Sequence, residues 1–268
     1  AEWDELLSRN LDDLKAWLEP QFKRGAIELS VVGDIAWDDA SAAVAQTLGA
    51  LPAREPPANT KAAATVPPPK KLFDYTTTVL PIGPQLKQVA IAWYWPIAEA
   101  LDTRTERRCS LLSAIVGDRL RVKLREELGA AYSPSATFVR TPGFPTLNYL
   151  QLYAEVEPVR AKQAFQIIVR ETTALATNGP DADEFARAKP PYLHEMNNYR
   201  QTNAYWGATV LADAQQHPDR IVSARNRAED MAAITLEEIV QLARHTLNPK
   251  DSLKFGTVPM AASPGQVR

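Results

Sequence analysis

This sequence of 268 residues contains one cysteine and three histidines, which is too few for several common kinds of site. The single cysteine, Cys109, excludes an internal disulfide and any cysteine-based zinc cluster. Because Cys109 lies in a helical pattern beside Leu111 and Leu112, we expect a small core or interface residue rather than a reactive thiol.

The three histidines, His194, His217 and His245, are isolated from one another in the sequence. None has a second histidine at the spacing that lets two imidazoles bind one zinc ion. His194 is followed by Glu195, but neighbouring helical residues point about 100° apart and do not converge on one ion. We therefore predict no metal site on this chain.

Other catalytic and binding signatures are also missing. There is no Gly-x-Ser-x-Gly nucleophile motif, and the eleven glycines are scattered rather than gathered into a phosphate-binding loop.

No apolar run reaches the roughly 18 residues of a membrane span. The net charge of -2 argues against a nucleic-acid partner. The N-terminus shows no signal-peptide pattern, so we expect an excised or processed piece.

What remains is a regular pattern of helical and extended segments, interrupted by prolines. Leu112, Val116, Leu120, Leu124 and Leu128 recur every four residues, which predicts a buried helical stripe. Proline spacing and hydrophobic periodicity together predict helices at 11–22, 38–48, 105–128, 159–177, 181–199, 204–216 and 236–246, and strands at 27–32, 72–80, 86–95, 131–140, 147–157 and 252–258.

The strands are grouped rather than alternating with helices, which predicts an α+β fold: a two-layer antiparallel sheet packed by helices. The segment from Leu11 through a strand ending at Val32 is similar to that from Leu236 through a strand ending near Val258, 225 residues later. This repeat predicts one complete unit and part of a preceding one, although helix-turn-strand is also a common pattern. The predicted boundaries are 1–50 for the closing helix-strand-helix of the preceding unit, 51–71 for a proline-rich linker, 72–260 for the complete unit, and 261–268 for a tail.

The segment Leu124-Arg125-Glu126-Glu127-Leu128-Gly129-Ala130-Ala131-Tyr132 carries the candidate site. A helix that ends at Gly129 and is followed by a strand places Arg125 and Tyr132 where both could face one cleft. A guanidinium and a phenol can stabilise the charge that develops on a carbonyl oxygen under attack. The alternative is an ordinary solvated helix face and a common strand aromatic. Trp93 and Trp95 share one strand face and are expected in the core.

The chain resembles the non-zinc, C-terminal half of the insulinase/pitrilysin family of zinc metallopeptidases. The resemblance spans nearly the whole sequence. It is carried by the Arg125-to-Tyr132 element together with segments that are suggestive in combination: Ile27 to Asp34, Leu51-Pro52, Ile115 to Leu120, Asn203 to Trp206 and Ile234 to Ile239.

The resemblance implies units like those of the mitochondrial processing peptidase, arranged as two halves around a chamber. The zinc motif would belong to an N-terminal partner half, on the same polypeptide or a separate subunit, so no cofactor is expected on this chain. Arg125 and Tyr132 would contact the scissile carbonyl of a peptide substrate, with 86–95 and 131–140 lining the chamber. The resemblance also implies a bacterial periplasmic or envelope location.

Two functions from different classes follow. The first is the substrate-binding, zinc-lacking half of a metalloendopeptidase, inactive when isolated. The second is a non-catalytic scaffold or protein-binding module that keeps the same fold. A stand-alone enzyme of another class is disfavoured, because no nucleophile or cofactor loop is visible.

Overall fold

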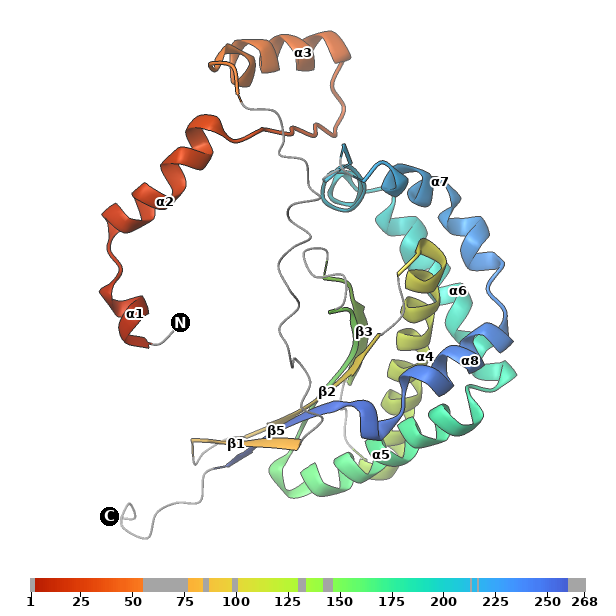
Figure 1. The fold of residues 1–268 in the computed structure, drawn as a ribbon. Coiled ribbons are helices and arrows are strands. Elements are labelled where there is room, and N and C mark those ends of the chain that lie inside the picture. Colours follow the sequence, from red (N-terminus) through yellow and green to blue (C-terminus); the bar gives the residue numbers. More distant parts are fainter. Residues whose placement is uncertain are drawn as a thin grey trace. The chain divides into compact units, whose positions relative to one another are not determined.

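The computed structural model describes residues 3–54, 77–83, 87–97, 101–129, 134–141, 147–212, 214–215 and 217–259. The chain divides into two compact units, one of residues 1–66 and 199–224 and the other of residues 67–198 and 225–268. Figure 1 shows the helices and strands of both units.

The larger unit is built on one five-stranded sheet in the order β1-β5-β2-β4-β3. Its strands are β1 (Thr77–Ile82), β2 (Val89–Pro96), β3 (Ser135–Val139), β4 (Tyr149–Val156) and β5 (Leu253–Pro259). All neighbouring strands are antiparallel except β1 and β5, which are parallel. The predicted α+β class is confirmed, with one parallel pair in the sheet.

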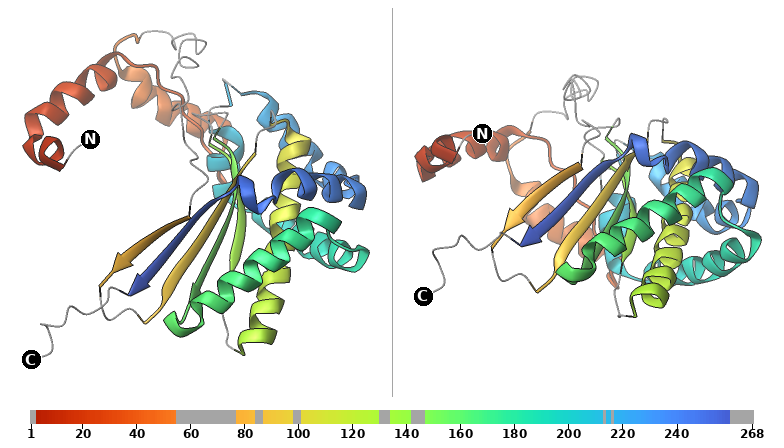
Figure 2. Two further views of the ribbon diagram at one scale, coloured as in Figure 1. Left: turned by 60° about the horizontal axis from the view of Figure 1, so that its bottom comes forward. Right: turned by 90° about the horizontal axis from the view of Figure 1, so that it is seen from below.

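Helices pack on one face of this sheet (Figure 2). Helix α4 (Thr103–Leu128) contacts β3 and β4, and α5 (Ala161–Asn178) contacts β2. Helix α8 (Leu236–Thr246) packs on α4 and α5. The unit also contains most of α6 (Ala182–Tyr199), the end of α7 (Asp219–Ala232), and the short 3-10 helices η3 (Pro158–Arg160) and η5 (Pro249–Asp251).

The core lies between these helices and the sheet. All five members of the predicted α4 stripe are at most 2% exposed, and Cys109, Trp93 and Trp95 are completely buried. The two indole rings meet edge to face, with centroids 5.2 Å apart. The predictions of a buried leucine stripe, a core cysteine and core tryptophans are therefore confirmed.

The smaller unit contains α1 (Trp3–Ser8), α2 (Leu11–Arg24), α3 (Trp37–Gln46), the 3-10 helix η1 (Leu48–Ala50) and the π-helix η4 (Tyr205–Leu211). A small cluster of Tyr205, Val210 and Ala224 is its described core. Many of its large apolar side chains are exposed instead. Trp3, Trp17, Phe22 and Trp37 each expose more than two thirds of their surface.

The predicted strand at 27–32 is wrong, because this segment pairs with no described strand. Its side chains make scattered contacts within the smaller unit: Ser30 Oγ donates to the carbonyl of Leu211 at 3.3 Å, and Glu28 Oε1 accepts from the amide of Gln215 at 3.2 Å. A strand requires a neighbour to complete its ladder of hydrogen bonds. The sequence pattern suits a strand, but the described residues provide no partner for it.

Candidate functional site

The face of the sheet opposite the helices is the first candidate surface. Along β2, Val89, Ile91, Trp93 and Trp95 enter the helix-packed core, so the alternate residues Ala90, Ala92, Tyr94 and Pro96 lie on the other face. Figure 2 shows that no described helix of this unit covers that face. Antiparallel sheets often leave one face free, and this one is rich in tyrosine rather than in charge.

Three aromatic rings from three neighbouring strands meet on this uncovered face. Tyr94 of β2 contacts Tyr149 of β4 and Phe255 of β5 edge to face, with centroids 5.5 Å and 5.8 Å away. Partial burial, reinforced by the neighbouring Tyr149, raises the pKa of Tyr94 above its ordinary value. The phenol of Tyr94 is therefore protonated at neutral pH, and the group combines aromatic rings with hydroxyl groups.

A polar pair adjoins these rings on β4. The hydroxyl of Tyr153 donates to Glu155 Oε1 at 2.6 Å. This hydrogen bond, helped by some burial and by the charge of Glu155, raises the pKa of Tyr153. No cationic side chain in the described part of the chain pairs with Glu155. The pair thus places one negative charge on an aromatic surface.

The C-terminal end of α4 is the second candidate, because it carries Arg125. The helix ends at Gly129, whose φ of 65° is left-handed and whose amide donates to the carbonyl of Arg125 at 3.0 Å. The side chain of Arg125 is exposed. The helix-then-glycine layout predicted around this residue is confirmed.

Within the described part of the chain, Arg125 differs from the other basic residues of α4, because its side chain has no ion pair or hydrogen bond there. Each of the others has an ion pair or side-chain hydrogen bond: Arg104 with Glu238, Arg107 with Asp230, Arg108 with Thr105, Arg119 with Glu184, Arg121 with Asp118 and Lys123 with Glu126. Among the described residues no such contact of the Arg125 side chain occurs. Its guanidinium is therefore available to a ligand.

Tyr132 lies outside the described residues, and so do Leu86 and Ala131 at the ends of the predicted chamber-lining segments. Whether Arg125 and Tyr132 converge therefore stays a prediction. Of the lining segments, the described parts are β2 and β3, and both belong to the sheet with the uncovered face.

The histidines take no part in either surface. His194 Nε2 lies 3.1 Å from the side-chain amide of Asn198, and His245 occupies the last turn of α8. In the ranges that the structure describes, no three His, Cys, Asp or Glu side chains are grouped as metal ligands. Over the same ranges, no helix has the length and apolar character to cross a membrane.

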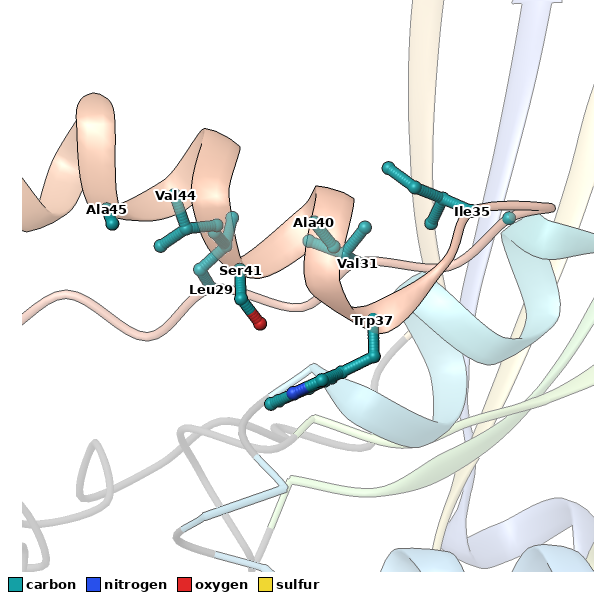
Figure 3. A pocket seen from close by; sticks show the side chains of 9 residues that line it. Leu29, Val31, Ile35, Trp37, Ala40, Ser41, Val44 and Ala45 are labelled. Carbon is teal, nitrogen blue, oxygen red and sulfur yellow. The ribbon is translucent and has the colours of Figure 1, made fainter.

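The smaller unit has an apolar pocket of about 600 Å³ between the segment before α3 and α3 itself (Figure 3). Leu29, Val31, Ile35, Trp37 and Val44 line it, and Ser41 supplies the one side-chain hydroxyl among the lining residues. Such a lining suits the apolar surface of a protein better than a polar small molecule.

Sequence reasoning missed the aromatic surface of the larger unit. Tyr149, Tyr153 and Glu155 alternate along β4, which is the signal of one strand face. The sequence does not reveal that Tyr94 and Phe255 stand beside them, because this depends on the register of three strands far apart in the chain.

Solved structures share this fold at low identity. A protease from Helicobacter pylori matches with a TM-score of 0.73 and 14% identity over 97% of this chain and 62% of its own. A peptidase M16 inactive domain from Pseudomonas fluorescens matches with a TM-score of 0.64 and 18% identity over 87% of this chain and 53% of its own. The periplasmic protease PqqL from Escherichia coli matches with a TM-score of 0.61 and 14% identity over 85% of this chain and 25% of its own.

The chain thus spans between a quarter and about three fifths of the lengths of these proteins. No curated protein matches it. Residues 8–190, more than half of the sequence, match the profile of the peptidase M16 inactive domain. The predicted resemblance to the non-zinc half of the insulinase family is confirmed, and the chain belongs to the peptidase M16 inactive-domain family.

Proposed function

We propose that this chain is the substrate-binding, zinc-lacking half of a metalloendopeptidase that cleaves peptides in a chamber closed by a partner half. The observation that carries the proposal is the uncovered, tyrosine-rich sheet face in a chain of the M16 inactive-domain family. An extended peptide offers backbone groups and alternating side chains, and a hydroxyl-bearing aromatic surface can contact both.

In this proposal Arg125 and Tyr132 reach the scissile carbonyl from this half. Zinc held by the partner half would supply the attacking water. The role of Arg125 and Tyr132 is to donate hydrogen bonds to the carbonyl oxygen as negative charge develops on it. One preplaced donor of this kind contributes roughly 3 kcal/mol to transition-state stabilisation. Division of the groups between two halves couples the chemistry to closure around the substrate.

The experiment is reconstitution of the chain with its zinc-bearing half, followed by kinetics on a peptide substrate. Tyr132→Phe and Arg125→Gln should each lower kcat by about 100-fold with bound zinc unchanged. Arg121→Gln is the matched control, since Arg121 lies one turn earlier and is already paired with Asp118. Wild-type turnover in both test variants would refute the proposed roles.

The alternative is a scaffold or protein-binding module of the same fold. It is favoured by the many large apolar side chains that the smaller unit exposes. In that case the reconstituted assembly would form without peptidase activity, and neither Arg125 nor Tyr132 would affect any function beyond stability. We also propose a bacterial envelope location, which the similarity to the periplasmic protease PqqL from Escherichia coli supports.

We also propose that residues 1–50 are the closing part of a preceding homologous unit, joined by a linker at 51–71 to the complete unit at 72–260 and a tail at 261–268. Two capping boxes lie 225 residues apart: Asn10 with Asp13 at the start of α2, and Thr235 with Glu238 at the start of α8. Both helices then lead toward a segment with a strand-like sequence.

The two copies differ in what surrounds them. At the displacement of 225 residues, Trp17 of α2 corresponds to Leu242 of α8. Trp17 is 68% exposed, whereas Leu242 is 5% exposed. Strand β5 after α8 is inserted between β1 and β2, whereas 27–32 after α2 has no described strand beside it. The exposed apolar residues of α2, and the apolar pocket beside α3 that Figure 3 shows, are accounted for if the rest of the preceding unit covers them.

A further inference from the structure

The uncovered sheet face contains a group of side chains whose chemistry suits a cation. The register aligns Tyr153, Ala92 and Phe255 in one row across β4, β2 and β5. One step along the strands, Glu155 is opposite Ala90. Directly opposed residues share a face, so all five side chains lie on the uncovered side.

The two alanines separate the larger groups. Adjacent strands are about 4.8 Å apart, so Tyr153 and Phe255, on either side of β2, are separated by roughly 10 Å of sheet. Tyr94, the next residue of β2 on this face, carries the third ring at one end. Ala92 is only 8% exposed, because the larger side chains beside it cover it, whereas Ala90 next to Glu155 is less buried.

Among the described strand residues of this face, no cationic side chain compensates the charge of Glu155. Of the described strand residues assigned to it, Glu155 is the one charged side chain, and no lysine or arginine of the described ranges pairs with it. Tyr153 donates to one carboxylate oxygen and fixes its position, which leaves the second oxygen for a ligand. One carboxylate is too few for a divalent metal ion, which takes several oxygen ligands.

We propose that Tyr94, Tyr153, Phe255 and Glu155 form a subsite for the cationic side chain of a bound peptide, a lysine or an arginine. The inference rests on the proposed function and adds a preference of the same surface. The aliphatic stem lies along the rings, and the ammonium or guanidinium reaches Glu155 over Ala90. Aromatic rings favour a long apolar stem, and a carboxylate favours the cationic group at its end.

The test measures binding of two fluorescein-labelled extended peptides to the 268-residue chain by fluorescence anisotropy. The peptides differ at one central position, lysine in one and norleucine in the other, so that they share a stem and differ in charge. The wild-type chain should bind the lysine peptide about fivefold more tightly, and Glu155→Gln should abolish that difference. Glu229→Gln, which removes the same charge from helix α7, should preserve it.

Tyr153→Phe provides a second variant, because it keeps the ring and removes the donor that orients Glu155. It should lose about half of the preference for lysine. Circular dichroism melting of each variant establishes that the fold is intact. Equal affinity of the wild-type chain for both peptides, no binding of either, or a lysine preference that survives Glu155→Gln would overturn the subsite.

Kinetics of the reconstituted enzyme distinguish failure of the subsite from failure of the proposed function. Glu155→Gln should raise KM about fivefold for the lysine peptide alone, whereas Tyr132→Phe should lower kcat for both peptides. Turnover that depends on Tyr132 but not on Glu155 would remove the subsite and keep the peptidase role. Absence of turnover together with absence of binding would remove both.

Discussion

The guanidinium of Arg119 donates two hydrogen bonds to the carboxylate of Glu184, and each of these side chains is only 13% exposed. The pair joins α4 to α6. Glu184 also accepts from the backbone amide of Asp181 at 3.0 Å, so its carboxylate is held from two sides. This is the kind of partly buried pair whose disruption costs more than that of an exposed one.

We predict that Arg119→Met lowers the free energy of unfolding by about 2 kcal/mol, because it leaves the Glu184 carboxylate without its cation. Arg121→Met is the matched control. Its partner Asp118 is close in sequence and both are well exposed, so the loss should be about 0.5 kcal/mol or less. Urea denaturation measures both. Equal losses would mean that the Arg119 pair contributes no more than a surface pair.

Two glycines after helix ends should respond differently to alanine. Gly179 ends α5 with φ of 75°, and an added Cβ would lie 2.6 Å from Val240 Cγ2 of α8. Gly129 ends α4 with φ of 65°, and nothing lies within 4 Å of its added Cβ. Gly129→Ala should therefore cost the conformational term alone, about 1 kcal/mol.

Gly179→Ala adds a steric clash with a packed helix to a larger conformational cost, because at ψ of 179° Gly179 lies outside the left-handed helical region that Gly129 occupies. We expect a loss of about 3 kcal/mol or more in the free energy of unfolding, measured by urea denaturation. Similar small losses in both variants would contradict the close packing of α5 against α8 at Val240.

Trp17 tests the proposal for residues 1–50. Its ring is largely exposed, so Trp17→Glu should change the free energy of unfolding of the chain by less than about 0.5 kcal/mol. The corresponding Leu242→Glu should unfold the larger unit, since it buries a charge in the core. When the chain is mixed with the rest of the preceding unit, size-exclusion chromatography should show weaker complex formation for Trp17→Glu than for wild type. Unchanged complex formation would argue against a preceding unit on this surface.

Helices with a dense apolar period were predictable from the sequence. The bounds 236–246 match those of α8, and the predicted 105–128 falls within α4, because in both a capping residue and a one-sided apolar stripe mark the element. Helix α7 was missed. Its segment carries several charges and few large apolar residues. The segment predicted as a helix at 204–216 forms a π-helix over a shorter range.

Long-range pairing explains the remaining differences. The strand predicted at 27–32 has the composition of a strand but no described neighbour, and composition cannot supply one. The parallel pairing of β1 with β5 aligns residues 177 positions apart, such as Thr77 and Lys254, and periodicity does not encode this pairing. For the candidate site, local spacing identified Arg125 and its glycine, whereas the Tyr94, Tyr149 and Phe255 group depends on tertiary register.

The start of α4 should give stability a dependence on acid pH. Asp102 caps this helix, and its Oδ1 accepts from the amide of Thr105 at 2.6 Å. That backbone hydrogen bond lowers the pKa of Asp102 from its ordinary 3.8. A hydrogen bond from the Thr105 side chain and the charges of Arg108 and Arg104 lower it further, whereas partial burial acts in the opposite direction. A carboxyl whose pKa is lower in the folded state stabilises the fold above its unfolded pKa, and this is lost as pH falls through the folded value.

Asp102→Ala should therefore lower the free energy of unfolding by about 1 kcal/mol at pH 7. The gap from wild type should begin to close below about pH 4 and shrink further as the pH falls past the folded pKa, because the wild-type carboxyl is then protonated and caps the helix poorly. Asp102→Asn, which keeps an accepting oxygen but does not titrate, should stay close to wild type at neutral pH and keep its stability in acid better than wild type does. Chemical denaturation between about pH 7 and acid pH measures the free energy of unfolding of all three proteins. If wild type and Asp102→Ala differ by the same amount at both ends of this range, the cap does not depend on ionisation.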